Sequence, residues 1–352
     1  MYSFACDYLE GCHEEVLKAL AESNMEQAPG YGADRFTEKA VSGIRQACHA
    51  EKASVYLLNG GTQTNQVVIS TMLQPYEGVL SADTGHVSVH EAGAIEFSGH
   101  KVLTLPEHNG KVAASDVEEY VQRFYADGNH EHMVFPGMVY ISHPTEYGTL
   151  YTAAELRALS ETCRRNHLTF YLDGARLGYG LAASDTDVTL PLIAELCDVF
   201  YIGGTKVGAL NGEALVFPRG NEPPHFTAQI KQHGALSAKG RLIGVQFAAL
   251  FNNNLYFRIS RHAVEMAEKI RAVFQKAGCR FYIDSPTNQQ FVILKNDTLE
   301  KLKNYVEYGF WQKYDDTHTV VRFASSWATT EEGIRELQHA VDLCVTKGDS
   351  DQ

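Results

Sequence analysis

A single lysine, Lys206, follows a strand-like apolar run that ends in glycines. The run Asp198 to Ile202 leads into Gly203-Gly204-Thr205, and a second apolar run covers Ala214 to Phe217. Little side-chain bulk therefore surrounds this amine at the end of a predicted strand. An amine in such a place can form a Schiff base with an aldehyde. The alternative is a solvated loop lysine, which is the commoner state of this residue type.

A carboxylate, Asp173, closes another strand-like run, Leu168 to Leu172, and is followed by Gly174-Ala175-Arg176. A carboxylate at a strand end can pair with a protonated ring nitrogen and so keep a pyridinium ring electron-withdrawing. Taken alone, Asp-Gly is also typical of a plain turn. Arg176 could bind an anionic group of a substrate or pair with a surface carboxylate.

Two further features could serve a flat, phosphorylated cofactor. The turn Gly60 to Gln66 opens a helical pattern, and free N–H groups at a helix N-terminus suit a phosphate; helix capping by Gly and Thr is the alternative. His86 begins a helix after a strand, where an imidazole could stack on a ring or move a proton. His86 and His90 would also suit a metal, but a third ligand is missing, so we expect none.

The elements that position these residues alternate between strands and helices, which predicts an α/β domain with a mainly parallel sheet. Ligands of such sheets bind at the carboxyl ends of the strands, where Gly60, Asp173 and Gly203 lie. Capping boxes are predicted at Ser115/Glu118 and Thr152/Glu155. The predicted strands are 54–58, 79–82, 102–105, 138–142, 168–172 and 198–202. The predicted helices are 14–22, 37–50, 66–73, 86–95, 115–125, 152–165 and 190–196.

After about Gly240 the pattern changes to that of a smaller α+β domain. A long helical stretch, 242–276, is broken near Asn252 to Asn254 and precedes strands at 280–283, 290–294 and 319–323 with helices from Leu299 and at 330–344. We therefore expect an N-terminal segment (1–30), a large domain (31–245) and a small domain (246–352). The terminal residues Lys347 to Gln352 are expected to fray.

Composition restricts the function classes. With 352 residues and 44% hydrophobic content the chain can bury a sizeable core, and its net charge of −13 argues against a nucleic-acid or anionic-membrane surface. No window resembles a membrane span, and no basic-then-apolar signal begins the chain. The seven scattered cysteines include no Cys-x-x-Cys pair and predict reduced thiols, so we expect a cytoplasmic protein.

Together, a phosphate turn, a stacking histidine, a ring-nitrogen carboxylate and a Schiff-base lysine indicate a pyridoxal-phosphate enzyme. Over nearly the whole chain the sequence resembles the low-specificity L-threonine aldolases of the β-eliminating lyase family. The matching stretches are the Asp7 region, 29–32, 60–66, His86 with 91–93, 173–176, 205–206 and Arg322. The resemblance implies a fold-type I, aminotransferase-like large domain and aldol cleavage of a threonine-type β-hydroxy-α-amino acid to glycine and an aldehyde.

The resemblance also implies roles for matching residues. Lys206 would hold pyridoxal phosphate as a Schiff base, Asp173 would face the ring nitrogen and His86 would stack on the ring. The implied cofactor set is Gly60, Gly61, Thr62, His86, Asp173, Arg176, Thr205, Lys206 and Arg241. The implied substrate set is Cys6, Tyr31, Arg176, Arg322, His143 and Thr145. Tyr31 and Arg241 look like groups lent to a neighbouring subunit's site, which implies a homodimer or homotetramer with shared sites.

Two positions depart from the family pattern. Cys6 replaces the usual Ser before the N-terminal Asp. The usual His-Asn-x-x-Gly stretch is replaced by Ser142-His143-Pro144-Thr145-Glu146-Tyr147-Gly148, in which Thr145 aligns with the family histidine and His143 would face the other way. The general base therefore stays open among His86, His143 and a bound water. The rival reactions are β-elimination, racemisation and transamination; a nucleotide-binding protein lacks its glycine-rich motifs.

Overall fold

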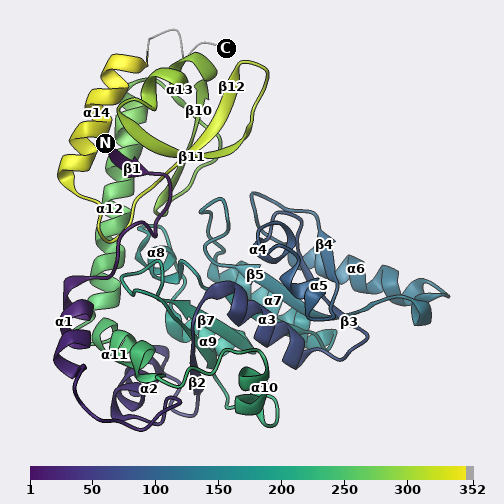
Figure 1. Cartoon of the computed structure of the whole chain (residues 1–352). Helices are drawn as coiled ribbons and strands as arrows, with labels where there is room; N and C mark the ends of the chain where they lie inside the picture. Colours follow the sequence, from purple (N-terminus) through teal and green to yellow (C-terminus); the bar gives the residue numbers. More distant parts are fainter. Residues whose placement is uncertain (346–352) are drawn as a thin grey trace.

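The computed structural model describes residues 1–345 and places the larger of two sheets at the centre of the molecule (Figure 1). The strands of this sheet are β2 (Ser54–Leu58), β3 (Glu77–Ala82), β4 (Val102–Leu105), β5 (Phe135–Ser142), β6 (Thr169–Asp173), β7 (Val199–Gly203) and β8 (Glu213–Phe217). Their order is β2-β8-β7-β6-β5-β3-β4. Only β8 runs against the others, so the prediction of a mainly parallel sheet is confirmed.

This topology brings distant residues to one edge of the sheet. The carboxyl ends of β3, β5, β6 and β7 meet there, because these strands are parallel neighbours. Since β8 runs in the opposite direction, its first residue, Glu213, joins the same edge and pairs with Gly203 and Leu58. The edge thus gathers one end of each of the seven strands.

Helices cover both faces of the large sheet. They are α1 (Glu14–Ser23), α2 (Arg35–Cys48), α3 (Gly61–Met72), α4 (His86–Val89), α5 (Ala94–Phe97), α6 (Ala114–Ala126), η1 (His130–His132), α7 (Ala153–Arg165), α8 (Leu177–Ala182), α9 (Leu190–Leu196), α10 (Phe226–Gln232) and α11 (Arg241–Leu250). Alternate strand residues feed two cores: Phe170 and Leu172 enter one, and Tyr171 enters the other with α3 and α10. Both faces are therefore apolar, and polar chemistry is left to the edge.

The smaller sheet lies apart from the larger one, and the N-terminal strand of the chain is its edge strand (Figure 1). Its strands are β1 (Tyr2–Phe4), β9 (Arg280–Phe281), β10 (Gln289–Lys295), β11 (Val306–Lys313) and β12 (His318–Ala324), in the order β1-β11-β12-β10-β9. The helices packed on it are α12 (Leu255–Lys276), α13 (Asn296–Leu302) and α14 (Glu331–Cys344). β1 and β11 are not among the predicted strands, because a three-residue strand and a half-exposed one carry little hydrophobic pattern.

Most predicted elements are found within a few residues of their expected bounds, and the differences have local causes. The Thr152/Glu155 capping box is confirmed, and Asn254, in a left-handed conformation, separates α11 from α12 as expected. The Ser115/Glu118 box is wrong: α6 begins after Ala113 without a side-chain cap.

Two further differences concern charged and glycine-containing segments. The Glu118 carboxylate accepts hydrogen bonds from Arg165 and Asn166 of the α7 end instead of capping its own helix. The expected helix 86–95 is split in two, because Ala92 and Gly93 have positive φ angles of 51° and 72°. Residues Lys347 to Gln352, which were expected to fray, lie outside the described residues.

Within residues 1–345, no helix is long and apolar enough to cross a membrane.

Candidate active site

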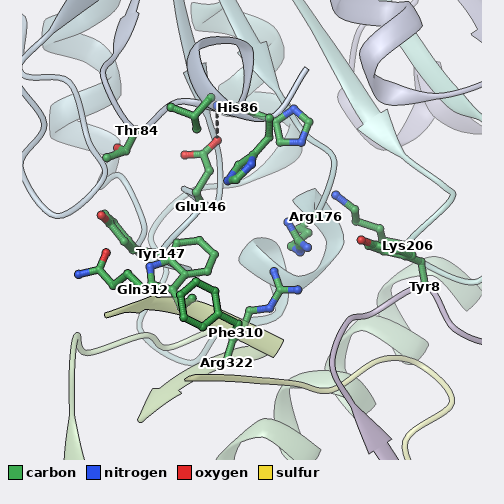
Figure 2. Close-up of a pocket in the computed structure, with 13 residues that line it drawn as sticks. Tyr8, Thr84, His86, Glu146, Tyr147, Arg176, Lys206, Phe310, Gln312 and Arg322 are labelled. Carbon is green, nitrogen blue, oxygen red and sulfur yellow. Dashed lines mark hydrogen bonds between the residues drawn. The ribbon is translucent and has the colours of Figure 1, made fainter. Parts of the chain in front are cut away.

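Two connected cavities open at the carboxyl edge of the large sheet, and Lys206 lines both. The inner cavity, of about 400 Å³, is lined by the phosphate turn and Asp173; the outer one, of about 690 Å³, reaches Arg322 and the aromatic residues of β11. His86, Arg176 and Glu146 also line both. Figure 2 shows Glu146 and His86 on one side and Lys206 on the other. The structure thus unites residues that are far apart in the sequence.

Lys206 lies three residues beyond β7, on a turn held by short-range contacts. The Tyr179 hydroxyl donates to the Lys206 carbonyl at 2.5 Å, and the amine lies 5.9 Å from the centroid of the Tyr8 ring. Burial, followed by the charge of Arg176, lowers the pKa of the Lys206 amine, although nearby carboxylates oppose the shift. A larger fraction of the amine is therefore neutral and nucleophilic than for an exposed lysine.

Asp173 is the last residue of β6 and is buried, with its carboxylate fully hydrogen-bonded. Oδ2 accepts from the Tyr140 hydroxyl at 2.6 Å and from Asn65 Nδ2 at 3.0 Å, and Oδ1 accepts from the Ala175 N–H at 2.9 Å. Burial raises the pKa of Tyr140 well above its usual value, so the phenol remains a donor. These three donors fix the orientation of the carboxylate at the inner cavity.

His86 is oriented by a buried acidic partner. Its Nδ1 lies 2.8 Å from Glu91 Oε1, which also accepts from Asn65 Nδ2 at 2.7 Å. Because Asn65 donates to Asp173 as well, one chain of hydrogen bonds links the imidazole to the strand-end carboxylate. Among residues 1–345 no group of three or more His, Cys, Asp or Glu side chains could hold a metal ion.

The phosphate turn lines the inner cavity through Gly60, Gly61 and Thr62. A Cβ at Gly61 would lie 3.0 Å from the Tyr201 hydroxyl, whereas one at Gly60 would meet open space. The twelve-residue helix α3 begins here, so its free N–H groups and dipole favour an anion in the cavity. Opposite the turn, the Thr205 hydroxyl donates to Glu213 Oε1 at 2.8 Å.

Two arginines line the outer cavity, and each is held by N-terminal residues. Arg176 makes a bidentate pair with buried Asp7, at 2.6 and 2.9 Å. Arg322 donates to the Ala5 carbonyl at 2.9 Å and to Gln289 Oε1 at 3.1 Å, while its buried Nε has no partner among the described residues. The predicted Cys6 does not line either cavity but lies between Ala5 and Asp7.

Three other predicted residues lie outside the two cavities. His143 is fully buried, with neither ring nitrogen hydrogen-bonded among the described residues, and burial lowers its pKa to about 4. Tyr31 is 54% exposed and lines a separate surface hollow with Lys231. Arg241 donates to the carbonyls of Ser23 and Glu26.

Thr145 does line the inner cavity, but its hydroxyl is engaged at 2.6 Å with that of Thr149, which in turn donates to the Asn109 carbonyl. The Thr145 hydroxyl is therefore hydrogen-bonded within its own loop and does not point a free group into the cavity.

Four polar residues of the site received no role from the sequence: Asn65, Tyr140, Glu146 and Glu213. Asn65 lies within the phosphate turn, and Glu213 follows the glycine-rich stretch that contains Lys206. The sequence positions of both residues therefore placed them next to predicted site residues. Tyr140 carried no such signal in the sequence, because it stands within an apolar strand-like run that is typical of core residues. Burial raises the pKa of Glu213 to about 7, although bonds from Thr205 and the Gly204 N–H oppose the shift.

The chain is similar in sequence to known proteins. Residues 4–343 match the sequence profile of the β-eliminating lyases. A low-specificity L-threonine aldolase of a Pseudomonas species is 30% identical over 95% of each chain, and one of Pseudomonas aeruginosa is 28% identical over 97% of each.

Solved structures agree. A threonine aldolase from Leishmania major is 40% identical, with a TM-score of 0.94 over 98% of this chain and all of its own. Aspartate aminotransferase from Thermus thermophilus, at 15% identity, shares the fold with a TM-score of 0.66 over 96% of this chain and 89% of its own. The aminotransferase-like, fold-type I architecture expected from the sequence is therefore confirmed.

Proposed function

The chain belongs to the β-eliminating lyase family, and we propose that it is a lyase that cleaves a threonine-type β-hydroxy-α-amino acid to glycine and an aldehyde. The observation that carries the proposal is one pair of residues: a partly buried lysine amine and a fully hydrogen-bonded carboxylate that line the same cavity. Asp173 ends β6, and Lys206 lies three residues beyond the end of the neighbouring strand β7, so both reach the inner cavity.

The inner cavity fits pyridoxal 5'-phosphate, the cofactor that we propose. The α3 N-terminus offers N–H donors for a phosphate, and a Cβ at Gly61 would crowd the Tyr201 hydroxyl at 3.0 Å. Asp173, fixed by three donors, suits a pyridinium nitrogen, and Lys206 suits an aldehyde carbon. We propose that His86 lies against the ring.

When bound, this cofactor supplies an electron sink for the pair released as the Cα–Cβ bond breaks. Lys206 would hold the cofactor covalently through Nζ, and its lowered pKa favours the neutral amine that this requires. Asp173 would keep the ring nitrogen protonated, and its donors hold the carboxylate ready without reorganisation.

The substrate carboxylate would bind in the outer cavity. Arg322 has a buried Nε without a partner among residues 1–345, and a carboxylate satisfies such a donor. Arg176 adds positive charge beside it, while Asp7 fixes the Arg176 guanidinium from behind. The two arginines would thus orient Cα and leave the β-substituent facing Glu146 and the aromatic residues of β11.

We further propose a cytoplasmic homodimer or homotetramer in which Tyr31 and Arg241 serve a neighbouring subunit's site. The exposure of Tyr31, and its place outside both cavities of its own chain, support this assignment. Cross-linking followed by mass spectrometry of the purified protein would give the subunit count and the neighbours of Tyr31.

The experiment for the proposed activity is a product assay. The protein, supplied with pyridoxal phosphate, is incubated with threonine, and aldehyde, glycine, pyruvate and ammonia are quantified. We expect aldehyde and glycine in equal amounts. Pyruvate or ammonia as the main product would instead assign the site to β-elimination, transfer of the amino group would assign transamination, and inversion at Cα would assign racemisation.

A further inference from the structure

Glu146 lies where the two cavities meet, on the turn that follows β5. Both hydrogen bonds that other described residues donate to its carboxylate end on Oε1: the His86 N–H at 2.9 Å and the Ser142 hydroxyl at 2.6 Å. In Figure 2 the carboxylate stands beside His86, across the cavity from Lys206. The group is therefore a held, nearly buried carboxylate in contact with the space that a substrate would occupy.

The turn that carries Glu146 is fixed by the smaller sheet. The Thr287 hydroxyl donates to the Gly148 carbonyl at 3.0 Å, and Gln289 Nε2 donates to the Glu146 carbonyl at 3.4 Å. Gly148 has a φ of 72°, and a Cβ there would lie 2.2 Å from the Ser285 hydroxyl. The carboxylate is thus held by its backbone as well as by its side-chain contacts, as a proton-transfer group must be.

Neighbouring candidates for a base are less suited. The His143 ring is fully buried and lines neither cavity, and the Thr145 hydroxyl is bonded to Thr149. His86 already uses Nδ1 toward Glu91. Among the described residues that line the outer cavity, Glu146 is the carboxylate.

Its electrostatic surroundings make the Glu146 carboxylate a stronger base than an exposed glutamate. Burial raises the pKa of Glu146, and the charge of Asp173 acts in the same direction, while the Ser142 hydroxyl and His86 oppose the shift. The other titratable groups that line the outer cavity with it are Tyr8, His90, Tyr147, Arg176, Lys206 and Arg322.

We propose that Glu146 is the general base that removes the proton from the substrate β-hydroxyl group. The inference rests on the proposed aldol cleavage. The proton passes to the Glu146 carboxylate, the O–H electron pair becomes the second bond of the aldehyde carbonyl, and the Cα–Cβ bond breaks. Its electron pair stays with Cα, which takes up a proton to give glycine, and Glu146 loses its proton to water. No further reactant is needed.

The test compares Glu146→Gln with wild type and with Glu222→Gln. Gln at 146 keeps an oxygen for the His86 N–H and the Ser142 hydroxyl but cannot take a proton. Glu222, which accepts from the Ser54 hydroxyl at 2.8 Å, lies outside both cavities and is the matched control. The measurements are kcat/KM for aldehyde release from threonine across pH, and exchange of the glycine α-protons in deuterated water. Glycine has no β-hydroxyl, so its exchange does not need the proposed base.

We expect Glu146→Gln to lower kcat/KM for threonine by about 10²- to 10⁴-fold, the usual contribution of a general base, and to abolish the rise of the wild-type profile with pH. Glycine exchange and covalent cofactor content should stay close to wild type, as should all properties of Glu222→Gln. In wild-type protein, the ¹³C signal of the Glu146 carboxyl, assigned by its loss in Glu146→Gln, should titrate above those of exposed glutamates.

Two results would overturn the assignment: unchanged threonine cleavage in Glu146→Gln, or an equal loss of cleavage, glycine exchange and cofactor, which would mark Glu146 as structural. A wild-type protein that exchanges glycine protons but releases no aldehyde would contradict the proposed function instead. The failures of the two claims are therefore distinguishable.

Discussion

The floor and the roof of the cleft are built differently. The floor consists of Asp173, Asn65, Tyr140 and Glu213, at or near one edge of the large sheet. Asn65 and Tyr140 donate to Asp173, and Glu213 accepts from Thr205 and the Gly204 N–H, so the side chains of the floor are held by hydrogen bonds within the large domain. The roof consists of Phe310, Trp311, Gln312 and Arg322, from β11 and β12 of the smaller sheet.

The two parts also differ in how far their groups are satisfied. Arg322 Nε lacks a partner among residues 1–345, and Phe310 is 72% exposed. The floor is organised before any ligand binds, whereas the roof has one buried donor without a partner among the described residues and a largely exposed aromatic ring. For the proposed reaction we therefore expect the cofactor chemistry to depend on the floor and substrate selection to depend on the roof.

Loss of the floor's charge should have the largest effect. Asp173→Asn keeps the size of the side chain but removes the negative charge, so kcat should fall by about 10²- to 10³-fold with little change in KM. Steady-state kinetics with saturating cofactor measures both constants. Tyr140→Phe, which removes one of three donors and leaves the charge, is the control and should cost less. Equal activities of Asp173→Asn and wild type would remove the distinction between floor and roof.

Among the residues of the cleft, we expect Asp7, which connects the two parts, to contribute most to the free energy of unfolding. Asp7 is buried between Arg176 of the floor side and Asn288 Nδ2, which donates at 2.9 Å, so Asp7→Asn leaves a buried guanidinium unpaired at a cost of about 3–5 kcal/mol. Urea unfolding at pH 7 measures the loss. Glu26→Gln, which breaks an exposed bidentate pair with Arg35, is the control and should change the midpoint little.

The same pair predicts a pH dependence. Burial alone would raise the pKa of Asp7, but the charges of Arg176 and Lys206 hold it below its usual range. A lowered folded-state pKa contributes stability that is fully present above the unfolded value of about 3.9 and is lost as the pH falls below it. Asp7→Asn should flatten the stability profile in this acid range. An unchanged slope would show that other carboxylates dominate it.

In the roof, Arg322→Lys should affect binding more than turnover. Lysine keeps the charge but not the planar set of donors, so KM for threonine should rise by about 10- to 100-fold while kcat changes less. Arg271→Lys, at an arginine paired with exposed Asp284, is the control and should leave both constants unchanged. A fall in kcat with constant KM would move Arg322 into the chemical step.

Phe310→Ala should have the smallest effect. The ring is mostly exposed, so its loss should change stability by no more than about 0.5 kcal/mol, and KM for threonine by only a small factor. The same variant should weaken binding of a β-hydroxy amino acid with an aromatic side chain more than binding of threonine. Equal effects on the two substrates would mean that the roof does not contribute to selection of the substrate side chain.

The sequence predicts the floor better than the roof for a physical reason. Asp173 and Lys206 each follow a short apolar run and stand beside glycines, and parallel strands bring such ends together. The hydrogen bonds from Asn65 and Tyr140 to Asp173 join different secondary-structure elements, so no local sequence pattern predicts them. Arg322 was expected only through family resemblance, since β12 places it by pairing with distant strands.

The turn after β5 shows where pattern reading fails. The segment Ser142 to Gly148 has neither helical nor strand periodicity, and comparison with the family directed attention to His143 and Thr145. Gly148 and the contacts from Thr287 and Gln289 decide instead which side chain meets the cavity. Those contacts come from residues more than a hundred positions later in the chain.

The central claim is that the Lys206 amine holds an aldehyde cofactor covalently. Borohydride treatment of the purified, cofactor-loaded protein, followed by peptide mass spectrometry, tests it most directly. We expect the phosphopyridoxyl group on the peptide that contains Lys206, and no fixed label in Lys206→Ala. Label on another lysine, or an unlabelled protein that still cleaves threonine, would contradict the account.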